Sequence, residues 1–281
     1  GAAETEALLA ADNAPAPTVL RVNRPRVTRQ RALAALADAG IAAHATTFAA
    51  DGVVLDTTVD PAALPGHEEG WFAPQGEASQ LVGALLGVAA GGRLLDAHAS
   101  PGGKALAAAA AGARVLGLDP HRAGLARLRS EAARLGLGVA VAQADALAPP
   151  LAASARFDAV LVDAPCSGLG TLRQHPEIRW RRTPKDLVAR AVVQGRILAS
   201  VAGHVAAGGA LVYATCTLAQ LENDDVVAAF LAAHPEFTRD DPRPLLPAPA
   251  RALVDAAGAL RTYPHRHGLD GFYAVRLVRS C

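Results

Sequence analysis

The stretch LLDAHASPGGK, residues 94–104, decides the fold class of this chain. An apolar β-strand here runs through Asp96 into a glycine-rich turn, and a helix follows near Lys104. Glycines let a ligand approach the backbone, and the start of a helix offers free N–H groups. The stretch is not a P-loop, because the four-residue gap between glycines is missing and Ala105 replaces a magnesium-binding hydroxyl. It also lacks the G-x-G-x-x-G dinucleotide fingerprint, so it predicts a ligand-binding turn of another kind.

Strands and helices alternate regularly from about residue 77, which is typical of a doubly wound α/β domain. We expect strands at 93–97, 114–118, 139–143, 157–162, 210–215 and 272–278, and helices at 104–111, from Pro120, from Pro184 and at 222–233. Upstream, a strand at 18–22, a helix at 28–39 and a strand at 53–58 indicate a small βαβ-type unit that ends near Trp71. We therefore expect two domains, residues 1–75 and 76–281.

The composition is that of an ordinary globular protein, with 281 residues of which 51% are apolar and 19% charged. It excludes wholesale disorder, and three widely spaced cysteines disfavour a disulfide framework. The formal net charge of +1 gives no overall field for nucleic acid. The uncharged stretch 197–221 is interrupted by glycines and threonines, so we expect no membrane span. We also expect a cytoplasmic protein without a signal peptide and, because residue 1 is glycine, a piece of a longer chain.

Acidic residues end four successive predicted strands: Asp96, Asp119, Asp145 and Asp163. The carboxyl ends of such strands face the crevice in which doubly wound folds bind ligands, and an acid after the second strand commonly grips ribose hydroxyls. Asp is also a common turn residue after a strand, so turn chemistry remains an alternative for each position.

Two cysteines follow the fourth and fifth strands of the predicted sheet. Cys166 lies in DAPCSG (163–168) and Cys216 in TCT (215–217). If these strands are neighbours, as in a 3-2-1-4-5 order, their ends lie about 5 Å apart and both thiols face one pocket. A lone cysteine is usually a small buried hydrophobe, but two thiols at adjacent strand ends favour chemistry. Zinc is disfavoured, because His98 would be only a third ligand.

Basic residues cluster in two places. Five arginines occur between residues 21 and 31, and a second group follows the first cysteine: Arg173, His175, Arg179, Arg181, Arg182 and Lys185, with Trp180 among them. Phosphate contact is one interpretation. A solvated charged surface is the alternative, and we favour it for either cluster taken alone.

These motifs together resemble the RsmB/Sun-type RNA cytosine-5 methyltransferases over nearly the whole chain. Residues 96–104 resemble the family's cofactor loop, 163–167 its substrate-cysteine loop and 213–217 the end of its nucleophile strand, with further matches at 173–180, 222–223 and 270–273. Within the family, the likeness is greatest to bacterial small-subunit rRNA enzymes with an N-terminal NusB-like domain, which this sequence does not include. The resemblance implies a Rossmann-like methyltransferase domain preceded by a small α+β, RRM-like, RNA-binding subdomain.

The resemblance also implies S-adenosylmethionine as cofactor and RNA, specifically small-subunit rRNA, as partner. It implies that Cys216, as thiolate, adds to carbon 6 of cytosine, so that carbon 5 can attack the methyl group, and that Cys166 helps to eliminate the thiolate afterwards. Lys104 is one group that could lower the pKa of the thiol, and Asp163 is expected to bridge cofactor and base. The implied cofactor-binding residues are His98, Ala99, Ser100, Pro101, Gly102, Gly103, Lys104, Asp119, Asp145 and Asp163. We expect a monomer without a metal.

Departures from the family pattern keep other functions open. His98-Ala99-Ser100 stands where the family has Cys-Ala-Ala, Ala105 where it has Thr, and Gly76 where it has Asp. One alternative is an RNA-binding or ribosome-assembly module whose cofactor binding has weakened, and another is a tRNA cytosine-5 methyltransferase. A nicotinamide-dependent oxidoreductase is disfavoured, because its glycine fingerprint is missing.

Overall fold

The computed structural model describes residues 1–281 and contains two β-sheets. The large sheet has the strand order β10-β12-β9-β8-β5-β6-β7, with β11 paired to β12. Its strands are β5 (Arg93–Asp96), β6 (Arg114–Asp119), β7 (Val139–Gln143), β8 (Phe157–Asp163), β9 (Val205–Thr215), β10 (Phe237–Asp240), β11 (Ala259–Thr262) and β12 (Phe272–Arg279). The strands β7, β6, β5, β8 and β9 are parallel, which gives the 3-2-1-4-5 order considered above, and β12 runs antiparallel to β9.

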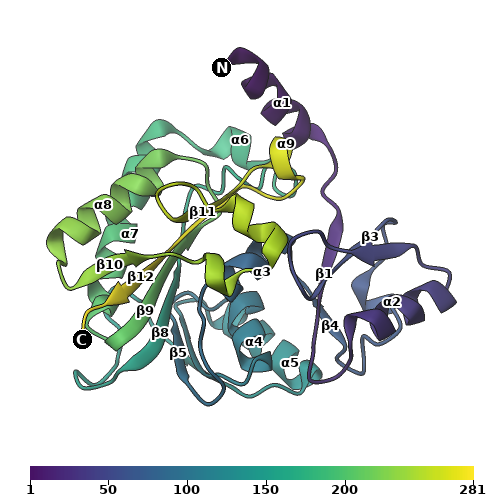
Figure 1. Cartoon of the computed structure of the whole chain (residues 1–281), viewed down its shortest axis with the longest axis horizontal. Helices are drawn as coiled ribbons and strands as arrows, with labels where there is room; N and C mark the ends of the chain where they lie inside the picture. Colours follow the sequence, from purple (N-terminus) through teal and green to yellow (C-terminus); the bar gives the residue numbers. More distant parts are fainter.

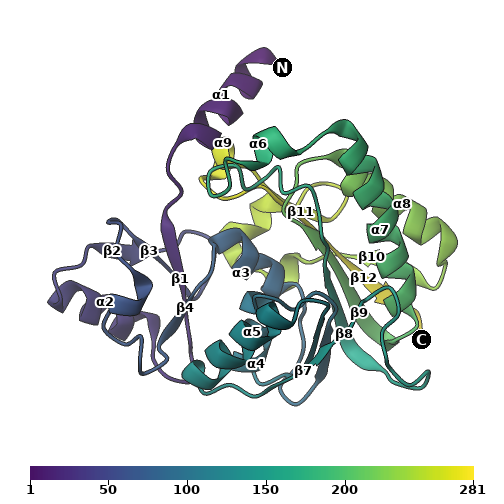
Figure 2. The ribbon, with the colours of Figure 1, turned by 180° about the vertical axis from the view of Figure 1, so that it is seen from behind.

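Helices cover both faces of the large sheet, as a doubly wound fold requires (Figures 1 and 2). The helices α3 (Glu77–Ala84), α4 (Gly103–Ala110) and α5 (Arg122–Leu135) lie on one face, and α7 (Pro184–Ala202) and α8 (Asp224–Ala233) lie on the other. Alternate residues of one strand serve the two cores: Leu94 packs with α3 and α4, whereas its neighbour Leu95 packs with α7 and α8. Burial on both faces explains why the strands are nearly continuous apolar runs.

The small sheet has the order β2-β3-β1-β4, and all of its pairs are antiparallel. It comprises β1 (Thr18–Val22), β2 (Ala43–Ala45), β3 (Gly52–Leu55) and β4 (Phe72–Pro74), covered by α2 (Arg29–Asp38). The βαβ-type expectation was therefore wrong in its pairing, and it missed β2 and β4, which at three residues each are too short to show a period. We propose that the division between the two units lies at residues 75–76.

Helix α1 (Ala2–Asn13) extends away from both sheets (Figure 1) and was not anticipated. Most of its residues are exposed and its apolar residues do not share one face, so the sequence carries no amphipathic signal there. Short helices α6 (Ile178–Arg181) and α9 (Pro264–His267) lie beside it, and His265 Nε2 is 3.2 Å from Glu4 Oε1. Short 3-10 helices occur at 61–63, 220–222, 243–245 and 248–253.

Two boundaries differ from the sequence-based expectation. Helix α5 begins at Arg122 rather than at Pro120. Asp119 Oδ1 accepts a hydrogen bond from the His121 N–H, so residues 119–121 form a turn that contains Pro120 and precedes the helix. Strand β9 begins at Val205 rather than at residue 210, and it passes through the glycine pair at 208–209. Gly208 has φ of +71°, and the register with β8 shifts near that point, so the strand continues through a bulge. No helix combines the length and apolarity needed to cross a bilayer.

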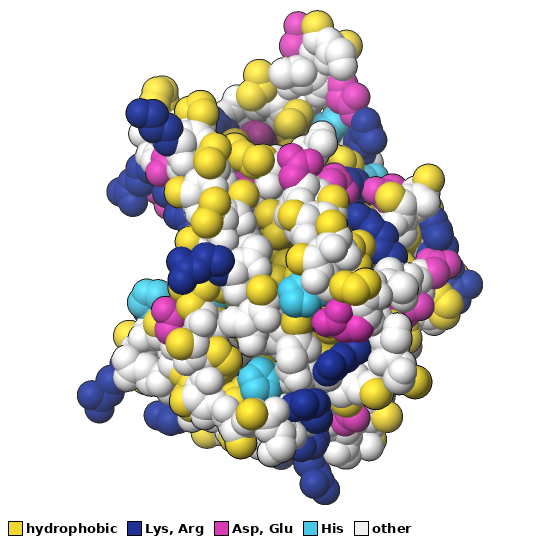
Figure 3. Space-filling model, turned by 90° about the vertical axis from the view of Figure 1, so that its left-hand side faces the viewer, with side chains coloured by type: hydrophobic (Ala, Val, Ile, Leu, Met, Phe, Trp, Pro, Cys, Tyr) yellow, Lys and Arg dark blue, Asp and Glu magenta, His cyan; other side chains and the backbone are white.

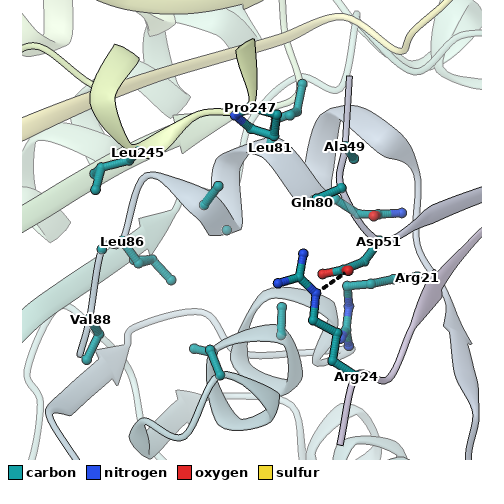
Figure 4. Close-up of a pocket in the computed structure, with 17 residues that line it drawn as sticks. Arg21, Arg24, Ala49, Asp51, Gln80, Leu81, Leu86, Val88, Leu245 and Pro247 are labelled. Atoms are coloured by element: carbon teal, nitrogen blue, oxygen red, sulfur yellow. Dashed lines mark hydrogen bonds and ion pairs between the residues drawn. The ribbon is translucent and has the colours of Figure 1, made fainter. Parts of the chain in front are cut away.

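Most hydrogen bonds of the N-terminal arginines lie within the small unit, and Arg26 reaches the large unit at the Leu135 carbonyl. Arg21 Nε donates to Gln75 Oε1 over 2.6 Å, and Arg29 Nη1 donates to the Ala49 carbonyl. A cavity of about 300 Å³ lies between the units, and there Arg24 pairs with Asp51 (Figure 4). None of the four acids that end the strands lines this cavity, and neither cysteine does.

Candidate active site

Two thiols meet at the carboxyl edge of the large sheet. Strand β8 ends at Asp163 and β9 at Thr215. The Ala164 N–H donates to the Ala214 carbonyl, so β9 stays paired with the residue that follows β8. The loops that follow bring Cys166 Sγ to 3.3 Å from Cys216 Sγ. The adjacent parallel strands β8 and β9 therefore bring the two thiols into contact.

The contact makes the two thiols differ in acidity. The hydrogen bond from the Cys166 thiol, opposed by burial and aided by the Lys104 charge, lowers the pKa of Cys216 below its ordinary value. The same contact, together with burial, raises the pKa of Cys166 well above its ordinary value. The arrangement favours a thiolate at Cys216 and a thiol at Cys166, which makes Cys216 the more reactive nucleophile.

Lys104 connects the glycine-rich turn to the cysteine pair. Its Nζ is 2.6 Å from Asp163 Oδ2, and its ammonium lies 5.3 Å from the centre of the Phe272 ring. The lysine side chain is only 8% exposed, so its charge acts in a partly desolvated setting. Lys104 therefore interacts with Asp163, and on the pKa of Cys216 the two charges act in opposite directions: Asp163 raises it and Lys104 lowers it.

Asp96 is buried beneath the same turn. Its Oδ1 accepts a hydrogen bond from the His98 N–H, and burial together with the negative charge of Asp163 raises its pKa to about 7. Near neutral pH this carboxyl is thus poised between its neutral and charged forms, directly below the candidate cofactor turn.

A buried carboxylate fastens the two cysteine loops to each other. Glu222 has no exposed surface, and it accepts hydrogen bonds from the backbone N–H and the hydroxyl of Ser167 and from Gln194 Nε2. The Ser167 hydroxyl also lies 2.8 Å from that of Thr217, which follows Cys216. The sequence had marked Glu222 only as a family match. The contact with Ser167 was hidden because it spans 55 residues of chain.

The glycine-rich turn lines a cavity of about 670 Å³. All seven residues from His98 to Lys104 contribute to its wall, as do Asp96 and Asp163. The opposite wall was not predicted and comes from the small unit, the start of α3 and the outer side of α5: Asp60, His67, Gln75, Gly76, Ser79, Arg127, Ser130 and Glu131. Of these, only Gly76 carried a signal, as a departure from the family pattern.

The turn has the features of a cradle for a small polar ligand. Gly102 has φ of +118°, and a Cβ there would lie 2.3 Å from Leu128, so only glycine fits. The buried atoms His98 Nδ1 and Ser100 Oγ have no hydrogen-bond partner, and burial lowers the pKa of His98, which keeps the ring neutral. Helix α4 begins at Gly103, and the first N–H groups of a helix can donate hydrogen bonds to a carboxylate. These residues therefore fit a charged, amino-acid-like ligand.

The other two strand-end acids lie outside this cavity. Asp119 accepts from the N–H groups of Ser100 and His121, which fixes the turn, and these bonds hold its pKa low despite burial. Asp145 is exposed and accepts from the Leu147 N–H. Turn chemistry thus accounts for the contacts of both residues, although each keeps further acceptor capacity.

Most of the second basic cluster is used to hold the segment after Cys166. Arg173 pairs with Asp270, Arg179 donates to Asn13 Oδ1, and Arg182 Nε donates to the Ser167 carbonyl. Arg181 and Lys185 are exposed and have neither an ion pair nor a hydrogen bond from the side chain. The cluster is therefore divided between structural contacts and free positive charge.

Comparison with known proteins identifies the family. The model of the family described as 16S rRNA methyltransferase RsmB/F matches residues 84–278. The chain belongs to the RsmB/F methyltransferase family. A second model, an RsmF/B-like ferredoxin-like domain, matches residues 1–61 of this RsmB/F chain, in accord with its small antiparallel sheet.

Curated RsmB relatives cover almost the whole of this chain. The ribosomal RNA small subunit methyltransferase B of Pseudomonas putida is 39% identical over 98% of the chain, and that of Citrobacter koseri is 34% identical over 98%. The chain spans 62% and 63% of the lengths of these two proteins.

Solved structures support the same RsmB/F fold. A crystal structure of the protein PH0851 has a TM-score of 0.90 and 27% identity, covering 98% of this chain and 62% of that one. NSun6 from Pyrococcus horikoshii has a TM-score of 0.87 at 19% identity, covering 100% of this chain and 95% of that one, and shares the fold. The predicted Rossmann-like domain with a small N-terminal α+β unit is confirmed.

Proposed function

We propose that this chain transfers the methyl group of S-adenosylmethionine to carbon 5 of a cytosine in RNA, through a covalent bond between Cys216 and the base. The proposed substrate is small-subunit rRNA, in line with the names of the curated relatives. Membership of a methyltransferase family supports the reaction class. The observation that carries the finer proposal is the 3.3 Å contact between the two thiols beside the Lys104–Asp163 pair.

The residues of the turn fit S-adenosylmethionine. The cofactor supplies an electrophilic methyl group. The first N–H groups of α4 would receive its carboxylate, and the partnerless His98 Nδ1 and Ser100 Oγ provide polar atoms within the same turn. Asp119 and Asp145 are proposed to take part through their remaining acceptor capacity.

Carbon 5 of cytosine is a weak nucleophile, which explains the need for covalent catalysis. The Cys216 thiolate would add to carbon 6 of the base and turn the ring into an enamine. Carbon 5 would then take the methyl group as the bond between the methyl carbon and the sulfonium sulfur breaks, and the cofactor would leave as a thioether. Water would then take the proton from carbon 5, the electron pair of that bond would restore the double bond between carbons 5 and 6, and Cys216 would leave carbon 6 as the thiolate. Cys166 assists this release, because its raised pKa favours the thiol form, which carries a proton next to the departing sulfur.

The positive charge of Lys104 supports the thiolate of Cys216 before attack. Asp163 is held by Lys104 at the junction of the cavity and the cysteine pair, which suits a residue that contacts both cofactor and base. In a duplex, the target base would have to leave the stack, at a cost of a few kcal/mol.

The direct test is methyl transfer from labelled S-adenosylmethionine to small-subunit RNA, with digestion and mass spectrometry for 5-methylcytosine. We expect product from the parent chain and none from Cys216→Ala. Methylation at another atom of the base, or undiminished product from the variant, would refute the proposal. Calorimetric titration of S-adenosylmethionine separates this function from an RNA-binding module, which would not bind the cofactor.

A further inference from the structure

Trp180 is the most exposed large apolar side chain of the protein, at 89%. It lies on α6, and its indole takes no part in the hydrophobic cores. The only other tryptophan, Trp71, packs partly against the core of the small unit beneath Arg31. An indole left in solvent on an ordered surface is unusual, and tryptophan is enriched where a partner binds.

The backbone on both sides of Trp180 is held in place. Arg179 donates to Asn13 Oδ1 over 2.6 Å and to the Asp12 carbonyl over 2.7 Å, and Arg182 Nε donates to the Ser167 carbonyl over 2.9 Å. Ser167 directly follows Cys166. The exposed indole therefore belongs to a segment that is fixed to the cysteine loop itself.

The charges around the indole favour a polyanion. Arg181 and Lys185 are exposed and have no ion-pair partner, whereas the nearby acids Glu177 and Asp186 both have polar partners. Glu177 Oε1 lies 3.4 Å from His175 Nδ1. Asp186 Oδ2 accepts hydrogen bonds from the backbone N–H and the hydroxyl of Thr183. Free cations beside a bare aromatic ring are the pattern by which proteins hold single-stranded nucleic acid, through phosphate contact and base stacking.

We propose that Trp180 stacks on an unpaired nucleobase of the RNA substrate, next to the base that reaches the cysteine pair, while Arg181 and Lys185 contact the flanking phosphates. This inference rests on the proposed RNA methyltransferase function and adds a contact surface to it. A purely apolar protein partner is disfavoured, because two unpaired cations would have to be desolvated against it.

Tryptophan emission tests the contact directly. The difference in emission between the parent chain and Trp180→Phe reports Trp180 alone and leaves Trp71 untouched. We expect a short oligocytidylate to quench this difference, with the same midpoint as filter binding. A fully paired RNA duplex, whose bases are stacked internally, should quench it far less.

Variants at the same position separate stacking from apolar contact. Trp180→Phe retains an aromatic face and should bind oligocytidylate within a few-fold of the parent, whereas Trp180→Leu retains only apolar bulk and should bind about 5- to 150-fold more weakly. Affinity for S-adenosylmethionine and the thermal midpoint should be unchanged in both. Val192→Ala, which shortens an exposed apolar side chain on α7, is the matched control and should bind RNA as the parent does.

Four outcomes would overturn the inference. Oligocytidylate binding without quenching, or equal affinities of the Phe and Leu variants, would exclude stacking while leaving the methyltransferase function intact. Failure of the parent chain to bind any RNA would refute both proposals, and methyl transfer to RNA with no effect of Trp180→Leu on KM would refute this one alone.

Discussion

Cys166 Sγ lies 3.3 Å from Cys216 Sγ, although 50 residues separate the two cysteines in the chain. The contact follows from the pairing of β8 with β9 and from the Glu222 network beneath both loops. It makes the two thiols chemically unequal, because the contact lowers the pKa of Cys216 and raises the pKa of Cys166. One pair of identical side chains can thus serve attack and release.

Removing either thiol should stop the reaction at a different stage. Cys216→Ala should lose methyl transfer by on the order of 10³-fold or more and form no covalent RNA adduct, because the nucleophile is gone. Cys166→Ala should accumulate an adduct, because release is impaired. Denaturing gel electrophoresis with labelled RNA measures both. Adduct from Cys216→Ala would reverse the assignment of the two roles.

The short distance between the thiols also predicts sensitivity to peroxide. The Cys216 thiolate attacks a peroxide oxygen, the O–O bond breaks and a sulfenic acid forms. The Cys166 sulfur then displaces its oxygen as water, which leaves a disulfide. Mild peroxide should abolish methyl transfer, lower the mass by about 2 Da and be reversed by dithiothreitol. Cys281→Ser, which removes the exposed third cysteine, should behave identically, and retention of three free thiols after treatment would contradict the prediction.

Lys104 should set the pH dependence of the reaction. Its charge lowers the pKa of Cys216, so Lys104→Gln should raise that pKa, and methyl transfer should require a higher pH than in the parent. The lone Asp163 charge left behind would raise the pKa further, so the double variant Lys104→Gln/Asp163→Asn should recover part of the shift. Rates across the pH range with saturating substrates measure this, and an unshifted profile for Lys104→Gln would exclude the electrostatic role.

The sequence predicted those parts of the fold that depend on local pattern. The regular alternation after residue 77 and the strand-to-turn passage at 94–104 were sufficient for the doubly wound sheet. The acids that follow strands were equally visible. Short strands such as β2 and β4 were missed, because three residues show no period and their pairing depends on β1 and β3. Helix α1 was missed, because its apolar residues are not confined to one face.

For the candidate site too, the sequence revealed the motifs but not the contacts between them. The cysteines and the glycine turn are sequence motifs and could be found as such. Their contacts could not, because Lys104 meets Asp163 across 59 residues and Ser167 meets Glu222 across 55. The far wall of the cavity comes from α5 and the small unit, whose positions depend on tertiary packing. The isolated charges of the second basic cluster were likewise indistinguishable in sequence from the paired ones.

Glu222 should be essential for the order of the cysteine loops. Glu222→Gln keeps the size of the side chain but replaces an acceptor oxygen with an NH₂ group, which would face the donors of Ser167 or Gln194. We expect a loss of about 1–3 kcal/mol in the free energy of unfolding, measured by urea denaturation. Glu69→Gln, the same change at an exposed glutamate, should have little effect, and equal stability of both variants would exclude the role of the network.

Asp96 should make stability fall as pH rises toward neutrality. Its pKa is raised from 3.8 to about 7 in the folded protein by burial and by Asp163, so the folded chain binds a proton more tightly than the unfolded chain does. The stabilisation that protonated Asp96 gives the folded chain is therefore complete below the pKa of Asp96 in the unfolded chain. It is lost as pH rises through about 7, the pKa of Asp96 in the folded chain. Asp96→Asn keeps the oxygen that accepts from His98 and cannot ionise. It should exceed the parent in the free energy of unfolding by on the order of 1–4 kcal/mol at about pH 8 and match it near pH 4.

Asp119→Asn provides the control of opposite sign, because the pKa of Asp119 is lowered and loss of its charge should destabilise most above the ordinary Asp pKa. A parent and an Asp96→Asn variant with the same pH dependence of unfolding would show that Asp96 remains ionised in the folded protein.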